Sequence, residues 1–368
     1  MMKKGKWLFF LMALVVFSIP LRAGAAEDFG TNRLYGTLPE EIRSLIPTDF
    51  FDSEAGSVLD TVNVGFFFRT VGTVLSAVLP GAFRNLAFVM GLLILSSVMK
   101  TLGSTVTSPA IQTVFSYISV VCVCGAVFRI TGDLFSCMER FVGYLHQFIT
   151  AIAPIMTALL YACGKVTTAT VSGGMLTLIL AFLESLCGGL LFPVLQITLA
   201  ISVGSALCST VDLSGMIAII SRILTFTMTF VSLLLTIVLA IQSVVAKSAD
   251  ELALKGVKFA VGGLVPIVGS AIGDALATIT GGLNVVRSVT GMAGAVAVVI
   301  VMLFPILYLA VNRLFLELSS VAAGILMLDK ESKFLQQMSG IVGFLMGASA
   351  LVTAFFTVTL AVMACIGS

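Results

Sequence analysis

From residue 62 onward the chain is almost continuously apolar, and this feature restricts its fold more than any other. Hydrophobic residues make up 59% of the 368 residues and charged residues 10%, and the mean hydropathy is +1.15. A typical soluble domain has about 45–50% apolar and about 25% charged residues. A soluble globule of this size would lack the polar side chains to cover its surface, so the composition predicts an integral membrane protein.

The apolar region divides into segments that could cross a bilayer as helices. Candidate spans lie at residues 82–102, 110–130, 141–162, 171–192, 194–211, 216–246, 292–311 and 340–366. Several of them are close to the length of about 20 residues that a spanning helix needs. The predicted fold class is all-α, a polytopic membrane protein with about seven or eight transmembrane helices. The positive-inside rule does not settle the topology, because Lys247, Lys255 and Lys258 fall on the outer side when the spans are counted from an external N-terminus.

The N-terminal part has the pattern of a secretory signal peptide. Three lysines among the first six residues precede an apolar core at 7–19, and small residues follow at Ala23 and Ala25. Acidic residues then outnumber basic ones up to Asp60. The predicted domains are a cleaved signal peptide at 1–25, a short acidic extracytoplasmic arm at 26–69 and a polytopic transmembrane domain at 70–368. The arm is interpreted either as lying on the membrane or a partner, or as a solvated linker.

Residues 255–283 differ from the other apolar segments because glycine, proline and one acid interrupt them. The residues that would break a helix or allow close packing here are Pro266, Gly269, Gly273, Gly281 and Gly282. The pattern predicts a broken or re-entrant segment, which is tolerated at membrane depth only where protein buries it or water lines it. A tightly packed, kinked helix is the alternative.

An internal repeat is also predicted, at an offset of 112 residues. Residues 153–156 match 265–268, and residues 191–195 match 303–307 at the same offset. Repeated units with broken helices are typical of transporters.

Two acids in apolar surroundings are the candidate pathway or coupling residues. Glu184 lies in the middle of a predicted span, where an acid is costly unless it faces protein or water. Asp274 lies in the glycine-rich segment, where breaks and an acid coincide. Arg222 and Arg287 are possible charge partners of Glu184, which otherwise has a structural role in fixing helix packing. His146 is interpreted as an interhelical hydrogen-bonding residue rather than a proton relay.

The sequence disfavours several other classes of protein. A net charge of +2 without a stripe of lysine and arginine argues against nucleic-acid binding. No catalytic residues, no metal site and no cofactor are predicted, because the chain has one histidine and no Walker A, H-E-x-x-H or intact G-x-G-x-x-G motif. The glycine pair Gly343 and Gly347 permits close helix approach, within the chain or between copies in a homo-oligomer.

Taken with this layout, four short segments give the chain a family resemblance. Lys258-Phe259-Ala260, Pro266-Ile267-Val268-Gly269, Asp274 and Phe304-Pro305, together with the terminal span, resemble the stage III sporulation protein AE family of endospore-forming Firmicutes. The resemblance covers nearly the whole chain. It has no established catalytic residues to carry over, so Glu184 and Asp274 rest on the residue pattern alone.

The resemblance implies a permease-like membrane subunit of a channel-like or secretion-like complex between mother cell and forespore, required for endospore development after engulfment. It implies other stage III proteins as partners, including ring-forming and ATPase components, and a place in the mother-cell membrane that surrounds the forespore. An autonomous ion-coupled secondary transporter of a small molecule is the alternative function. The predicted repeat and the two acids favour that alternative, whereas the signal peptide and the acidic arm favour the complex.

Overall fold

The computed structural model of the chain describes residues 64–105, 109–207, 213–264 and 269–365, with side chains described at 65–103, 111–207, 213–241 and 284–365. This described part is all-α, as predicted. Its helices are α5 (Val64–Thr105), α6 (Pro109–Ala162), α7 (Val166–Glu184), the π-helix η2 (Ser185–Leu191), α8 (Phe192–Leu207), α9 (Ser214–Leu264), α10 (Gly269–Ile325) and α11 (Asp329–Cys365).

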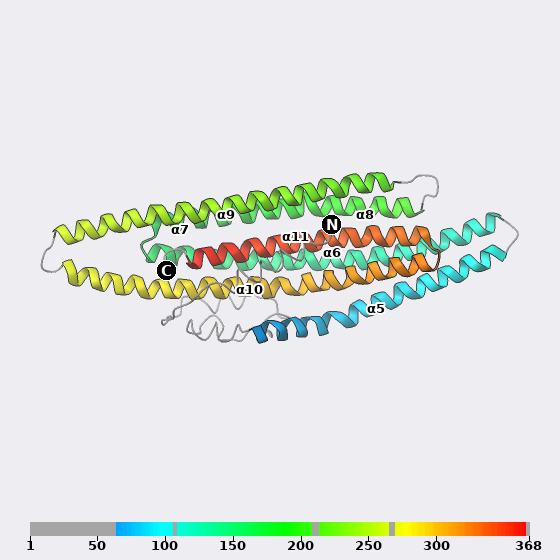
Figure 1. The fold of residues 1–368 in the computed structure, drawn as a ribbon, viewed down its shortest axis with the longest axis horizontal. Coiled ribbons are helices and arrows are strands. Elements are labelled where there is room, and N and C mark those ends of the chain that lie inside the picture. Colours follow the sequence, from blue (N-terminus) through cyan, green and yellow to red (C-terminus); the bar gives the residue numbers. More distant parts are fainter. Residues whose placement is uncertain (1–63, 106–108, 208–212, 265–268, 366–368) are drawn as a thin grey trace.

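The helices form a long bundle in which all of them follow roughly the same axis (Figure 1). Helices α10 and α11 pack against each other along their lengths, and α5 and α6 form a hairpin beside them. The elements α7, η2 and α8 form one continuous run that lies next to α9. At the right-hand end of Figure 1 the α5–α6 hairpin extends further than the other helices.

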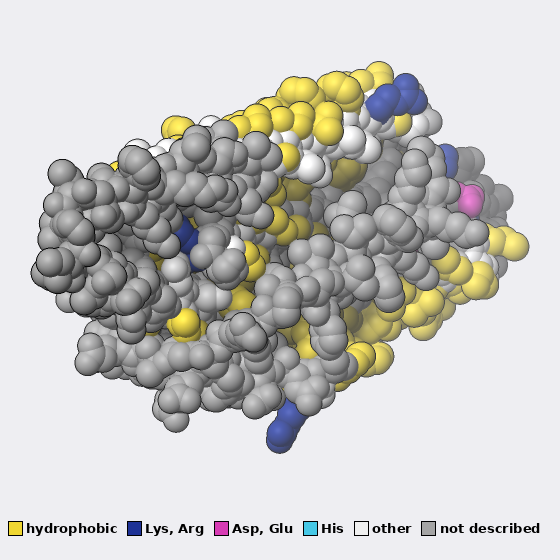
Figure 2. Space-filling model, turned by 60° about the vertical axis from the view of Figure 1, so that its left-hand side comes forward, with side chains coloured by type: hydrophobic (Ala, Val, Ile, Leu, Met, Phe, Trp, Pro, Cys, Tyr) yellow, Lys and Arg dark blue, Asp and Glu magenta, His cyan; other side chains and the backbone are white. Residues whose placement is uncertain are grey.

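Six helical stretches within the described residues are long and apolar enough to cross a membrane. They are Gly65–Gly103, Ile111–Ala162, Val166–Leu207, Ser214–Ile241, Asn284–Ile325 and Asp329–Cys365. The chain is therefore described as a multi-pass membrane protein. Hydrophobic side chains cover much of the described surface visible in Figure 2, and few charged ones interrupt them.

The predicted boundaries of several spans differ from the structure, which has six candidate spans in its described part instead of seven or eight. The predicted spans 110–130 and 141–162 belong to the single helix α6, and 171–192 lies with most of 194–211 in the run Val166–Leu207. The charged residues between Arg129 and Arg140 lower the hydropathy and suggested a boundary. Backbone hydrogen bonds continue through such residues, because exposed charged side chains do not interrupt the helical ladder.

The helices are much longer than one bilayer requires. Helix α6 has 54 residues, which corresponds to about 81 Å at a rise of about 1.5 Å per residue. The hydrocarbon core of a bilayer is about 30 Å thick. Part of each long helix must therefore lie outside the hydrocarbon layer or bend within it.

Several predicted features fall partly or wholly outside the described residues. The signal peptide and nearly all of the acidic arm lie there, as does Pro266. Helix α9 ends at Leu264 and α10 begins at Gly269, and Gly281 and Gly282 lie inside the continuous helix α10 rather than at a break. The re-entrant segment and the internal repeat stay predictions.

Candidate functional site

Glu184 lies where α7 changes into the π-helix η2. The N–H of Phe192 donates to the carbonyl of Cys187, five residues back, which is the π pattern. Pro193 contributes to the irregularity, since proline has no N–H to donate to the carbonyl four residues before it. Single π turns inside α-helices occur frequently at functional sites. The local sequence therefore places an acid at an irregular turn inside an apolar run.

His146 on α6 is the charge partner that the structure places beside Glu184. The His146 Nδ1 and Glu184 Oε2 atoms are 3.5 Å apart, and the two side chains are 40% and 64% exposed. Neither Arg222 nor Arg287 forms an ion pair with Glu184 within the described part of the chain. His146 thus contacts an acid on another helix that sequence reasoning had not assigned to it, but its Nδ1 makes no hydrogen bond within the described part of the chain, so the expected interhelical hydrogen bond is not seen there.

Glu184 also lines an open cavity of about 330 Å³, together with a second acid. The lining residues are Glu139, Val142, Glu184, Cys187, Gly188, Phe192, Pro193 and Gln196. They come from α6, the last residue of α7, η2 and α8, so the π-helix forms one wall. Two carboxylates and one amide over apolar walls can accept and release a proton or coordinate a cation, and this is the chemistry the cavity offers.

The depth of this cavity makes its acids significant. Glu184 lies 18 residues after the first residue and 23 residues before the last residue of the apolar run that begins at Val166 and ends at Leu207. It therefore lies within the apolar stretch Val166–Leu207. A carboxylate at that depth is costly unless it faces protein, water or a counter-charge. Because Glu184 remains 64% exposed in the single chain, its environment must be completed by a water-lined path or by a partner.

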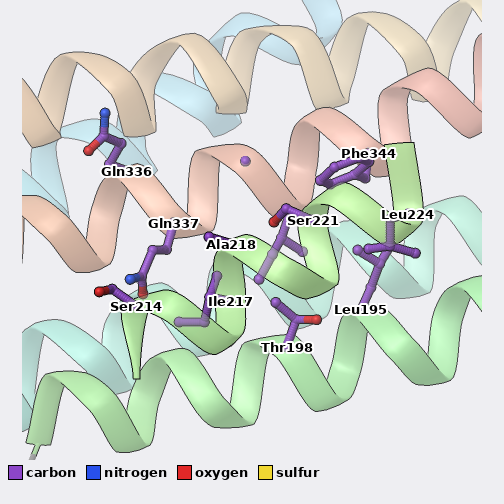
Figure 3. Close-up of a pocket in the computed structure, with 12 residues that line it drawn as sticks. Leu195, Thr198, Ser214, Ile217, Ala218, Ser221, Leu224, Gln336, Gln337 and Phe344 are labelled. Carbon is purple, nitrogen blue, oxygen red and sulfur yellow. The ribbon is translucent and has the colours of Figure 1, made fainter. Parts of the chain in front are cut away.

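A second pocket, of about 260 Å³, lies between α8, α9 and α11 (Figure 3). Its polar lining consists of hydroxyl and amide groups, supplied by Thr198, Ser214, Ser221, Gln336 and Gln337. In Figure 3 the Gln337 side chain points toward Ser214, whereas Gln336 points toward α10. The pocket suits a neutral polar group, because no charged side chain lines it. Sequence reasoning missed this pocket because an uncharged serine, threonine or glutamine in an apolar helix costs little, so it does not indicate a site as a buried acid does.

The other predicted site residues have different surroundings. Asp274 lies in the first part of α10, and its side chain is outside the described residues, as are the environments of Gly269, Gly273, Gly281 and Gly282. Arg222 is exposed on α9. Arg287 is fully buried on α10, and its Nη2 donates to the Ala364 carbonyl at 3.4 Å.

The close helix packing that glycine permits is found at positions the sequence did not single out. A Cβ added to Gly291 would lie 2.7 Å from the Cβ of Ala364 on α11, and one added to Gly294 would lie 2.3 Å from the Cδ1 of Ile152 on α6. Of the predicted pair, Gly343 accommodates the guanidinium of Arg313, whereas Gly347 has no neighbour within 4 Å of an added Cβ.

Among the side chains that the structure describes, no group of three histidine, cysteine or acidic residues could hold a metal ion. Comparison with known families gives one match: the model for stage III sporulation protein AE matches residues 60–367. No curated protein and no solved structure matches the chain.

Proposed function

The chain belongs to the stage III sporulation protein AE family, and from this membership we propose that it is a permease-like membrane subunit of a channel-like or secretion-like complex between mother cell and forespore. In this role it would be required for endospore development after engulfment. It would reside in the mother-cell membrane that surrounds the forespore. The family is not known for enzymatic activity, and we propose no catalytic role.

The observation that best supports this proposal is the exposed Glu184 on an otherwise apolar run. An acid at membrane depth is stable only where protein, water or a counter-charge surrounds it. In the single chain Glu184 has His146 on one side and the open cavity with Glu139 on the other. A subunit that contributes one wall of a water-lined passage, or that packs against a second subunit, provides the missing surroundings.

We propose as partners the membrane lipid, other stage III sporulation proteins with ring-forming and ATPase components, and further copies of the chain in a homo-oligomer. The acidic arm predicted at residues 26–69 supports contacts outside the cytoplasm, because a cleaved signal peptide would translocate it. Crosslinking in sporulating cells, followed by identification of the joined proteins, tests these partners.

A clean deletion in the native host tests the function. We expect normal vegetative growth and loss of heat-resistant spores at a stage after engulfment. Normal production of heat-resistant spores by the deletion strain would contradict the proposal.

Complementation of the deletion tests the two acids as pathway residues. Glu184→Gln keeps the size of the side chain and removes its charge, and we expect at least about a tenfold loss of heat-resistant spores with an unchanged amount of protein in the membrane. Asp274→Asn tests the second acid in the same way. Asp133→Asn is the matched control, because Asp133 is an exposed acid of α6 that does not line the cavity. Full complementation by Glu184→Gln would show that the pathway does not need the charge of Glu184.

The second candidate function is an autonomous ion-coupled transporter, which the shared cavity of Glu139 and Glu184 beside a π-helix favours. The purified chain, reconstituted alone into vesicles, distinguishes the two functions. Proton uptake driven by an imposed membrane potential, present in the wild type and absent in Glu184→Gln, would support the transporter. Absence of flux in the wild type, combined with spore loss in the deletion strain, supports the complex subunit.

A further inference from the structure

A group of cationic side chains lies beside the turn between α6 and α7, 19 residues before Glu184 in the sequence. The proposed pathway does not use these cations. The central residue of this cationic cluster is Arg287, which is 0% exposed on α10. Among the residues that the structure describes, the Nε and Nη1 atoms of Arg287 have no hydrogen-bond partner. Its Nη2 atom makes one long hydrogen bond, 3.4 Å, to the Ala364 carbonyl in the last turn of α11. A fully buried guanidinium thus has two nitrogen groups that donate to no atom of the described residues.

The described acidic side chains do not compensate this charge. They are Asp133, Glu139, Glu184, Glu317, Asp329 and Glu331. None of these six forms an ion pair with Arg287. Burying a cation without a counter-charge is costly in a low-dielectric environment, and each buried donor without an acceptor adds to the cost. The surroundings of Arg287 therefore favour binding of an anionic group.

A second cation lies close to Arg287. Lys165 is 5% exposed, and its Nζ is 3.4 Å from the Oδ1 of Asn284, which lies one helical turn before Arg287 on α10. Burial raises the pKa of the Cys163 thiol, and the charges of Arg287 and Lys165 act in the opposite direction on that pKa. Both charges are thus near the same thiol, in agreement with the contact between Lys165 and Asn284 one turn before Arg287.

The turn that holds Lys165 adds a helix N-terminus to the cluster. Gly164 has a φ of 75°, which glycine adopts without strain, and it ends α6 so that Lys165 stands at the N-cap position of α7. The Lys165 side chain makes no capping hydrogen bond, and its carbonyl accepts the first helical bond, from Ala169. The first N–H groups of a helix are partially positive and favour an anion.

The cluster lies at the level expected for lipid headgroups. Lys165 is in the short turn between the candidate spans Ile111–Ala162 and Val166–Leu207, and Arg287 is in the first turn of the span Asn284–Ile325. The α6–α7 turn and the end of α11 lie at the same end of the bundle, on the left in Figure 1. Tyr161 is exposed beside this turn, as aromatic side chains often are at the membrane interface.

From these observations we propose that Arg287, Lys165 and the N-terminus of α7 bind the phosphate group of an anionic phospholipid. Basic pockets between transmembrane helices bind such headgroups, and arginine matches the geometry of phosphate oxygens. The two cations are shielded from bulk water, so each ion pair with the phosphate is stronger than it would be at the surface. The bound lipid joins α7, α10 and α11 at this end of the bundle.

The test measures the thermal stability of the purified full-length protein in a neutral detergent. Water-soluble, short-chain phosphatidylglycerol is titrated against the wild type, with short-chain phosphatidylcholine and inorganic phosphate as separate arms. Arg287→Gln and Lys165→Gln are the test variants. Arg222→Gln is the matched control, because Arg222 is an exposed arginine of α9 that takes no part in the cluster.

We expect phosphatidylglycerol to raise the Tm of the wild type and of Arg222→Gln in a saturable way. In Arg287→Gln and Lys165→Gln the apparent Kd should weaken at least about tenfold, which corresponds to about 1.4 kcal/mol. An equal rise with phosphatidylcholine, or an unchanged response in both test variants, would overturn the proposal. If inorganic phosphate raises the Tm, phosphatidylglycerol does not, and the rise disappears in Arg287→Gln, the cluster binds a free anion and the proposed lipid ligand is wrong. If Arg287→Gln does not fold, Lys165→Gln decides the outcome.

Discussion

Replacing Gly291 with alanine should weaken the contact between α10 and α11. An added Cβ would lie 2.7 Å from the Cβ of Ala364, 2.8 Å from the Cε of Met156 and 3.2 Å from the Cα of Ala364. Carbon atoms in favourable contact are about 3.5–4.0 Å apart. Met156 can move its flexible end, but the Ala364 Cα belongs to the backbone of α11. The overlap can therefore be relieved only by moving the two helices apart.

The size of the effect follows from two opposing contributions. Overpacking of a well-packed core costs about 1–3 kcal/mol. Glycine to alanine in a helix interior stabilises by about 1 kcal/mol. Gly347→Ala serves as the matched control, because it brings the same gain in helix propensity at a position of α11 with no heavy atom within 4 Å of the new Cβ. The difference between the two variants isolates the packing cost, and we expect Gly291→Ala to be about 1–3 kcal/mol less stable than Gly347→Ala.

The assay is unfolding of the purified protein in detergent, followed with a thiol-reactive dye that reports exposure of buried cysteines. Cys163 and Cys187 are buried and become accessible when the bundle opens. Both glycine variants are measured beside the wild type under identical detergent and lipid conditions, since bound lipid shifts apparent stability. Equal stability of Gly291→Ala and Gly347→Ala would refute the close approach of α10 and α11 at this position.

Two further predictions concern buried polar groups. Glu331→Ala should cost about 1–3 kcal/mol in the same unfolding assay, because the buried Ser119 hydroxyl, which donates to the Glu331 Oε1 at 2.8 Å, loses its acceptor. In single-cysteine variants, Cys163 should react with maleimide more slowly at neutral pH than the exposed Cys122, since burial raises the pKa of the Cys163 thiol and lowers its thiolate fraction. Its reaction should accelerate only as the pH rises above the usual range for cysteine, and equal rates at neutral pH would contradict this reasoning.

Composition and hydropathy were sufficient to predict an all-α membrane protein, because they reflect the solvent that the surface must face. They were less reliable for the number of spans. Hydropathy falls between Arg129 and Arg140, yet α6 continues from Pro109 to Ala162. A helix is held by its backbone hydrogen bonds, and proline inside α6 at Pro154 does not end it either. Span boundaries in a bundle of long helices therefore depend on packing that local hydropathy does not contain.

The candidate site could be predicted only in part. Glu184 was identified because a single acid in an apolar run is costly, and that argument needs no tertiary structure. Its partner His146 and its cavity neighbour Glu139 lie on α6, about 40 residues earlier, and only the helix packing brings them together. Sequence reasoning instead proposed Arg222 and Arg287, because opposite charge was the only available criterion.

The length of the α5–α6 hairpin relative to the apolar layer favours the proposed subunit of a complex over an isolated transporter. On α10, Arg287 and Arg313 are 26 residues apart, which is about 39 Å and close to the thickness of about 40–45 Å of a bilayer with its headgroups. Glu184 lies within the layer that these arginines delimit. The far part of the α5–α6 hairpin extends past the other helices (Figure 1), and its exposed side chains include Leu102, Ile111 and Val114. Exposed apolar surface of this kind marks a site of interaction with protein or membrane. The extension lies beyond Arg313 and the α10–α11 turn, outside the layer that the two arginines delimit, so a partner protein suits its apolar side chains better than lipid does.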